Sequence, residues 1–112
     1  MILLIRGTSQ PFQWRTPYDS SEIKEIRMLF WQPDNEGTED CKLPLLKTKD
    51  MCSFDDTTKT FTVTLNQAET FAFKTDRKAY VQFRAITTSG FVFGIKAQPI
   101  TVYPNEDETI ME

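Results

Sequence analysis

The sequence contains no histidine, and this absence excludes several classes of function. Histidine is the commonest general base, the usual partner of a Ser or Cys nucleophile and the commonest metal ligand. Most hydrolase and metalloenzyme mechanisms are therefore disfavoured. We expect a protein without enzymatic activity, with no catalytic, cofactor-binding or metal-binding residues and no cofactor. A small enzyme is the least favoured alternative.

Cysteine is scarce too, since Cys41 and Cys52 are the only two in the chain. Two cysteines without a histidine do not complete a Cys/His zinc tetrahedron. Two reduced thiols in a cytosolic product are the favoured interpretation, and a disulfide between neighbouring strands is the alternative. The sequence does not decide between them.

Long apolar runs and clustered glycines are also missing. The run Met1–Ile5 is followed, not preceded, by the positive charge of Arg6, and it is shorter than the about 7 to 15 residues of a secretory signal core. No stretch approaches the roughly 20 apolar residues of a membrane span. The four glycines are too dispersed to cradle a phosphate. Gly94, inside a strand-like run, indicates a bulge or the close approach of another backbone, from this chain or a neighbouring subunit.

Excess charge of one sign is confined to the C-terminus. The net charge is −3, and Glu106, Asp107, Glu108 and Glu112 account for it, because residues 1–104 carry 12 acidic and 13 basic residues. A nucleic-acid binder normally clusters Lys and Arg on one face. We therefore expect one domain over residues 1–104, an acidic tail over residues 105–112, and neither nucleic acid nor a membrane as partner.

What the chain does have is aromatic, alternating segments. Phe, Trp and Tyr make up 12% of the residues, which favours strands. The clearest alternation places Phe61, Val63 and Leu65 on one face and threonines on the other. Further strands are expected at residues 2–6, 12–14, 26–32, 41–49, 51–54 and 79–86 and from 91 to 103, where the segment 41–49 is an edge or irregular strand and the segment 26–32 is central.

Helical and turn patterns are few. Ser20 or Ser21 is expected to cap a single helical turn, and Asn66 with Glu69 forms a capping box for a helix of at most about two turns. Residues 33–40 and 55–59 are expected to be turns or loops. The turn at residues 87–90 predicts a hairpin between the last two long strands, and Pro99 fits a bulge or an exposed edge.

About seven short strands, one short helix and frequent turns predict an all-β fold, a small antiparallel β-sandwich of the immunoglobulin-like type. The absence of strands alternating with long helices argues against a parallel α/β fold.

Three groups of residues are candidates for chemistry. The carboxylate pairs Glu39–Asp40 and Asp55–Asp56 can in principle share a metal ion, but both stand in turns, where Asp is favoured for its local hydrogen bonds. The strand 79–83 overlaps part of an RNA-recognition signature, yet core packing explains its alternation. Trp14, Tyr18 and Trp31 can stack on sugars or anchor a partner. Of these rings, Tyr18 is the better surface candidate and Trp31 is expected to be buried.

Several segments together resemble the small β-sandwich structural proteins of tailed phages and prophages of Gram-positive bacteria. The most specific is the run from Val63 to Phe73, with its Leu-x-Gln-x-Glu-Thr-x-x-Phe pattern, and the others are residues 6–14, 26–32, 81–84, 88–90 and 107–110. The segment 33–49 looks longer and less regular than the family pattern.

The resemblance implies a tail- or head-associated structural or assembly protein, located in the virion or the bacterial host cytoplasm. Its expected partners are other phage structural proteins and itself, as a homo-oligomer. It transfers no functional residue. The alternative from another class is a carbohydrate- or cell-surface-binding β-sandwich module that uses Trp14, Tyr18 and Trp31.

Overall fold

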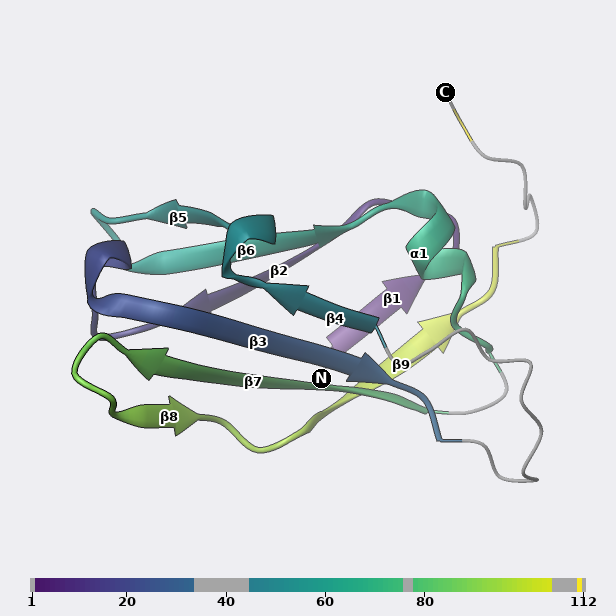
Figure 1. Cartoon of the computed structure of the whole chain (residues 1–112). Coiled ribbons are helices and arrows are strands. Elements are labelled where there is room, and N and C mark those ends of the chain that lie inside the picture. Colours follow the sequence, from purple (N-terminus) through teal and green to yellow (C-terminus); the bar gives the residue numbers. More distant parts are fainter. Residues whose placement is uncertain (1, 34–44, 76–77, 106–110, 112) are drawn as a thin grey trace.

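The protein is a sandwich of two β-sheets (Figure 1). The computed structural model describes residues 2–33, 45–75, 78–105 and 111. In these ranges it contains nine strands, one α-helix and two short 3₁₀ helices. The elements are β1 (Ile2–Ile5), β2 (Gln10–Arg15), η1 (Ser20–Glu22), β3 (Ile23–Trp31), β4 (Leu45–Thr48), η2 (Lys49–Met51), β5 (Ser53–Asp55), β6 (Thr60–Leu65), α1 (Gln67–Phe71), β7 (Ala79–Thr87), β8 (Val92–Gly94) and β9 (Gln98–Tyr103).

The larger sheet has six strands in the order β1-β9-β7-β3-β4, with β8 also paired to β7, and the smaller sheet has the order β2-β6-β5. All pairs are antiparallel except β1 with β9, which is parallel. The smaller sheet and the run β9-β7-β3-β4 follow the strand order of an immunoglobulin sandwich. The predicted all-β sandwich is confirmed, and β3 is central, as predicted.

The strand expected from residue 91 to 103 is divided in two. β8 and β9 lie along the same edge of β7, because β3 occupies its other edge. Ala85 pairs with Phe93 and Val81 with Gln98, so four steps along β7 match five steps along its partner. One extra residue is the mark of a β-bulge, and this division is one reason why the strands exceed the predicted seven.

Gly94 lies at the end of β8, where the bulge begins. A Cβ at this position would come within 2.5 Å of the Phe83 carbonyl oxygen. The predicted close approach of another backbone is therefore confirmed, and the backbone is that of β7 in the same chain.

The core lies between the sheets and is built from alternate residues of each strand. The predicted inward residues of β6 and β7 are all buried. The sheets interlock through rings: the centroids of Phe61 and Phe83 are 4.8 Å apart, and those of Phe12 and Phe30 are 5.0 Å apart. Burying an aromatic side chain contributes about 1.5–3 kcal/mol. The core residues are Leu4, Phe12, Ile23, Ile26, Met28, Phe30, Phe61, Val63, Leu65, Phe73, Ala79, Val81, Phe83, Ala85, Ile100 and Val102.

The capping box of α1 is confirmed. Asn66 Oδ1 accepts a hydrogen bond from Glu69 N at 2.8 Å, and Glu69 Oε1 accepts one from Asn66 N at 2.9 Å. The second carboxylate oxygen of Glu69 pairs with Lys47 Nζ of β4 at 2.5 Å. The first predicted cap is corrected: Asp19, not Ser20 or Ser21, is the N-cap of η1, with Glu22 closing the box. The sequence misled because Asp and Ser are equally good N-caps.

The turn between β1 and β2 is fixed against α1. Thr70, fully buried, donates its hydroxyl to Thr8 O at 2.9 Å and accepts from Gly7 N at 2.9 Å. Gly7 has φ +81, and a Cβ there would lie 2.4 Å from Phe71 Cζ. Arg6 lies over the same ring, with its guanidinium carbon 5.4 Å from the ring centroid.

We expect Gly7→Ala to lower the free energy of unfolding by about 2–5 kcal/mol, because a left-handed backbone costs about 1–2 kcal/mol and an overpacked contact costs about 1–3 kcal/mol. Gly90→Ala is the matched control, since Gly90 has φ +92 with open space around its Cα. It should lose only about 1–2 kcal/mol. Urea unfolding of both variants measures the difference, and equal losses would show that the contact with Phe71 is unimportant.

Candidate interaction surface

The two outer faces of the sandwich differ in chemistry. The outer face of the smaller sheet is polar except for Pro11, because the other residues that alternate with its core positions are Gln13, Arg15, Ser53, Asp55, Thr60, Thr62 and Thr64. A hollow of about 520 Å³ on this face is lined by these side chains, Thr64 excepted, together with Phe54 and Thr58. Such a face is stable in water and needs no partner.

The outer face of the larger sheet carries many apolar side chains. We call it the outer apolar face and define it by Leu3, Ile5, Leu29, Trp31, Leu46, Tyr80, Ile86, Val92 and Tyr103, which the strand registers place opposite the core side. Leu3, Ile5, Val92 and Tyr103 are 45–55% exposed, and the others are half-buried. Exposed apolar patches on a folded protein often mark its contact sites.

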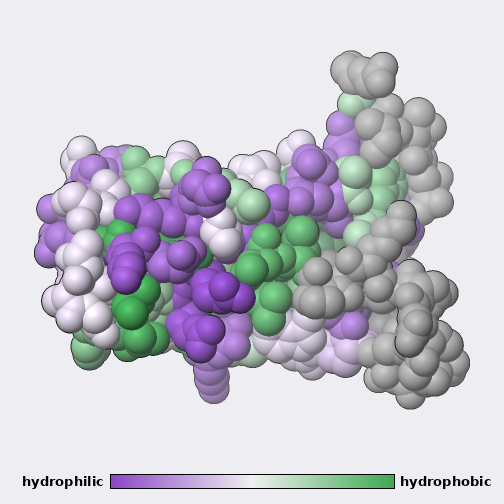
Figure 2. Space-filling view, viewed as in Figure 1, coloured by the Kyte–Doolittle hydropathy of each residue, from purple (hydrophilic) through white to green (hydrophobic). Residues whose placement is uncertain are grey.

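Figure 2 shows part of this face. Hydrophobic side chains, in green, gather in two areas, one over β8 and one over the right-hand parts of β3 and β4. Hydrophilic side chains lie between them, over the middle of β3 and β7. The face therefore alternates apolar and polar zones.

Arg27 and Arg84 occupy the polar zone. They are direct cross-strand partners on β3 and β7, both exposed, and neither forms an ion pair within the described part of the chain. Like charges directly opposite each other destabilise a strand pair. Two hollows of about 200 Å³ and 210 Å³ flank the pair; the first includes Ile86 and Val92 in its lining, and the second includes Leu29 and Leu46.

The three aromatic residues singled out from the sequence do not form one site. Trp31, expected to be buried, is half-exposed on the outer apolar face, where it stacks on Tyr80 with a centroid distance of 5.6 Å. Trp14 faces the other way, into the sandwich, and stacks on Phe83 at 5.9 Å while its Nε1 donates to Met28 Sδ. Tyr18 is half-buried against Phe93, at 5.3 Å. The three rings are therefore not brought together on one surface.

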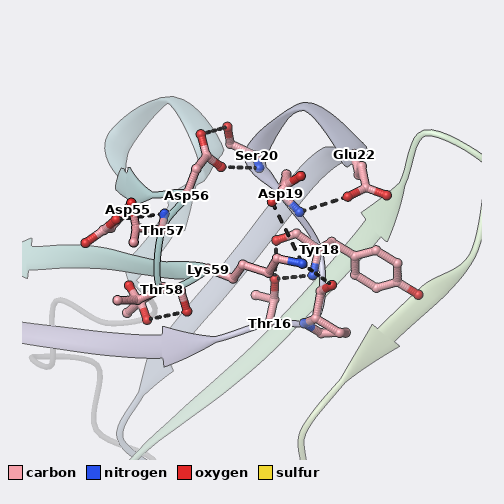
Figure 3. A network of polar contacts seen from close by, with 12 residues as sticks. Thr16, Tyr18, Asp19, Ser20, Glu22, Asp55, Asp56, Thr57, Thr58 and Lys59 are labelled. Carbon is pink, nitrogen blue, oxygen red and sulfur yellow. Dashed lines mark hydrogen bonds and ion pairs between the residues drawn. The ribbon is translucent and has the colours of Figure 1, made fainter.

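Of the carboxylates predicted to sit in turns, Asp56 lies in the turn between β5 and β6, whereas Asp55 is the last residue of β5; both lie at one end of the sandwich (Figure 3). Asp55 Oδ1 accepts from Thr57 N at 3.0 Å, which is a local turn contact, whereas Asp56 accepts from both Ser20 N, at 2.8 Å, and Ser20 Oγ. Asp56 therefore ties the β5–β6 turn to η1. Glu39 and Asp40 lie outside the described residues.

Further contacts fix the same end of the molecule. The hydroxyl of Thr16, which is buried, accepts a hydrogen bond from Tyr18 N at 3.0 Å and donates one to Tyr18 O at 2.9 Å. Its backbone N–H donates to Lys59 O at 2.8 Å. In the described ranges, no group of three or more Cys, Asp or Glu side chains is arranged to hold a metal ion. This network holds loops together.

Sequence reasoning missed most of the outer apolar face. The apolar character of both faces of residues 26–32 was visible, but it was explained by the central position of the strand. Strand periodicity shows which side chains share a face, and it does not show whether that face is covered. A count of the apolar residues alternating with core positions on β1, β3, β7 and β8 would have indicated it.

Cys52 has a free thiol, which donates to Thr48 O at 3.3 Å, and Cys41 lies outside the described residues. Burial raises the pKa of the Cys52 thiol above its ordinary value of 9.0, and the nearby charge of Asp50 adds to the effect while Lys47 opposes it. The thiol is therefore a weak nucleophile near neutral pH.

We expect iodoacetamide at pH 8 to modify Cys52 at least about tenfold more slowly in the folded protein than in urea, because the thiolate is both rarer and less accessible there. Peptide mass spectrometry separates Cys52 from Cys41. Since the folded pKa is raised, the contribution of this group to stability is present below pH 9.0 and is lost as the pH rises through the folded value. Equal modification rates of Cys52 in the folded and the urea-unfolded protein would contradict a partly buried thiol with a raised pKa.

No protein-family model matches the chain, and no curated protein resembles it significantly. In the described part of the chain, no helix is long and apolar enough to cross a membrane.

Proposed function

We propose that this is a non-enzymatic structural or assembly protein of a tailed phage or prophage, associated with the tail or head, that acts through protein–protein contacts. The single observation that carries the proposal is the contrast between the polar outer face of the smaller sheet and the outer apolar face of the larger one. A rigid sandwich with one uncovered apolar face suits a component held by neighbours in a particle. The assignment to phages rests on the sequence resemblance alone.

The face also suggests the chemistry of its partner. Arg27 and Arg84 stand side by side between apolar zones and form no ion pair in the described residues, although Glu25 lines one of the flanking hollows together with them. A carboxylate from another protein, placed between the two guanidinium groups, would relieve their repulsion and form charge-assisted hydrogen bonds. We therefore expect a partner whose surface is apolar with a central Asp or Glu, located in the virion or in the host cytoplasm during assembly.

The alternative is a carbohydrate- or cell-surface-binding module. The stacked and half-exposed pair of Trp31 and Tyr80 favours it, because flat rings bind sugar faces. Trp14 and Tyr18, which are turned against Phe83 and Phe93, no longer support it. Quenching of tryptophan fluorescence by host cell-wall glycans that is lost in Trp31→Ala would establish this alternative in place of the structural role.

The proposal is tested with the purified products of the genes that lie beside this one, among which it expects phage head or tail proteins. Val92→Glu puts a charged side chain in place of an apolar one on the outer apolar face. Thr64→Glu is the matched control, at an exposed strand position of the polar face. We expect one of those proteins to bind the natural chain, with Val92→Glu weakening the affinity by at least about tenfold and Thr64→Glu by less than about twofold.

Titration calorimetry gives the affinities, and circular dichroism checks that both variants fold. Arg84→Glu should also weaken binding, because it removes the positive charge that meets the partner's carboxylate. The affinity of the natural chain should fall as the salt concentration is raised. No binding to any of the neighbouring gene products, or equal effects of Val92→Glu and Thr64→Glu, would refute the proposal.

A further inference from the structure

We infer that β1 is a docking edge for a second copy of this chain, which pairs its own β1 antiparallel to the first and joins the two larger sheets into one. The inference concerns the edge of the sheet and not its face. It stands independently of which protein the outer apolar face binds.

The first argument is the state of the backbone at this edge. β1 is the last strand in the order of the larger sheet, with β9 on one side only. Arg6 N donates to Tyr103 O at 3.1 Å, so the backbone groups of Arg6 face β9. Because these groups alternate in direction along a strand, those of Leu4 also face β9, and those of Leu3 and Ile5 face away from it.

The groups that face away are open to a partner. In the described ranges, the N–H and C=O of Leu3 and the N–H of Ile5 make no hydrogen bond, whereas the Ile5 carbonyl accepts from Thr8 N and Oγ1. Unpaired edge groups of this kind are a template for another strand.

The second argument is the absence of protection at this edge alone. Natural edge strands are blunted by charges, prolines, bulges or very short length. β2 contains Pro11 and Arg15, β4 contains Lys47, and β5 and β8 have three residues each, β8 running into the bulge. β1 consists of the four apolar residues Ile2-Leu3-Leu4-Ile5, with no charge, proline or bulge.

The third argument selects a second copy as the occupant. β1 carries no charge, and Arg6 is turned away, because its Nη2 donates to Phe71 O at 3.0 Å and its guanidinium lies over the Phe71 ring. A two-fold axis perpendicular to the sheet therefore brings no like charges together. It places the exposed Leu3 and Ile5 beside the same residues of the copy on one common face. A face-to-face dimer would instead bring Arg27 and Arg84 against their own counterparts.

The experiment uses the whole chain and compares amides within one strand. Hydrogen exchange followed by NMR, at protein concentrations from about 10 µM to about 1 mM, covers the Kd range of weak self-association. We expect the Leu3 and Ile5 amides to become at least about tenfold more protected as the concentration rises. The Leu4 and Arg6 amides, which face β9, should change little and serve as the internal control.

Sedimentation velocity over the same range should show a monomer–dimer equilibrium. Ile5→Lys should weaken the dimer at least about tenfold, since it adds a charge to both sides of the joint, whereas Gln13→Lys, at an exposed position on the edge strand β2, should leave it unchanged.

Three outcomes would overturn the inference. The first is a monomer at every concentration, and the second is a dimer that Ile5→Lys does not weaken. The third is protection of the Leu3 and Ile5 amides only after a head or tail protein is added, which would show that the edge accepts a strand of another protein. A dimer without binding to those proteins would leave the inference intact and refute the proposed function.

Discussion

The structure depends on the contact between aromatic rings across the interior of the sandwich. Phe83 of the larger sheet is flanked by Phe61 and Trp14 of the smaller sheet, with ring centroids at 4.8 Å and 5.9 Å. In antibody domains the corresponding link between sheets is a disulfide backed by a tryptophan. Here the rings take over that role through burial and edge or offset packing. The fold therefore needs no covalent bridge between these strands.

That interior explains why the two outer faces are free to differ. Once alternate residues of each strand fill the core, the remaining residues are constrained only by what lies outside. On β6 they are Thr60, Thr62 and Thr64, which suit water, whereas on β3 they are Arg27, Leu29 and Trp31. A β-branched polar residue fits an exposed strand. Apolar residues at exposed strand positions need another explanation, and a partner surface is the one proposed above.

Much of the fold could be predicted from local patterns. The alternation of Phe61, Val63 and Leu65 and the capping pair Asn66 and Glu69 each report a short-range physical preference, and both were confirmed. The division of the last strand was not predicted, because it arises from the pairing with β7 and from the contact of Gly94 with the Phe83 carbonyl oxygen. These are relations between segments.

The candidate surface was harder to predict for the same reason. Tyr18 looked like the best exposed ring because it stands beside Pro17 in a loop, yet Phe93 from a distant strand half-covers it. Trp31 looked buried because its strand is apolar, yet it lies on the uncovered side of the sheet. Periodicity gives the side of a strand, and only the assembled sheets give the side of the molecule.

The parallel pairing of β1 with β9 has a consequence for how the molecule is made. Ile2–Ile5 is synthesised before its neighbour Ile100–Tyr103, and most of the domain lies between them in the sequence. Loop closure over so long a segment is slow compared with the formation of local hairpins such as β5–β6. β1 therefore has no β9 to pair with until most of the domain has been synthesised, and we expect the larger sheet to be completed late in folding.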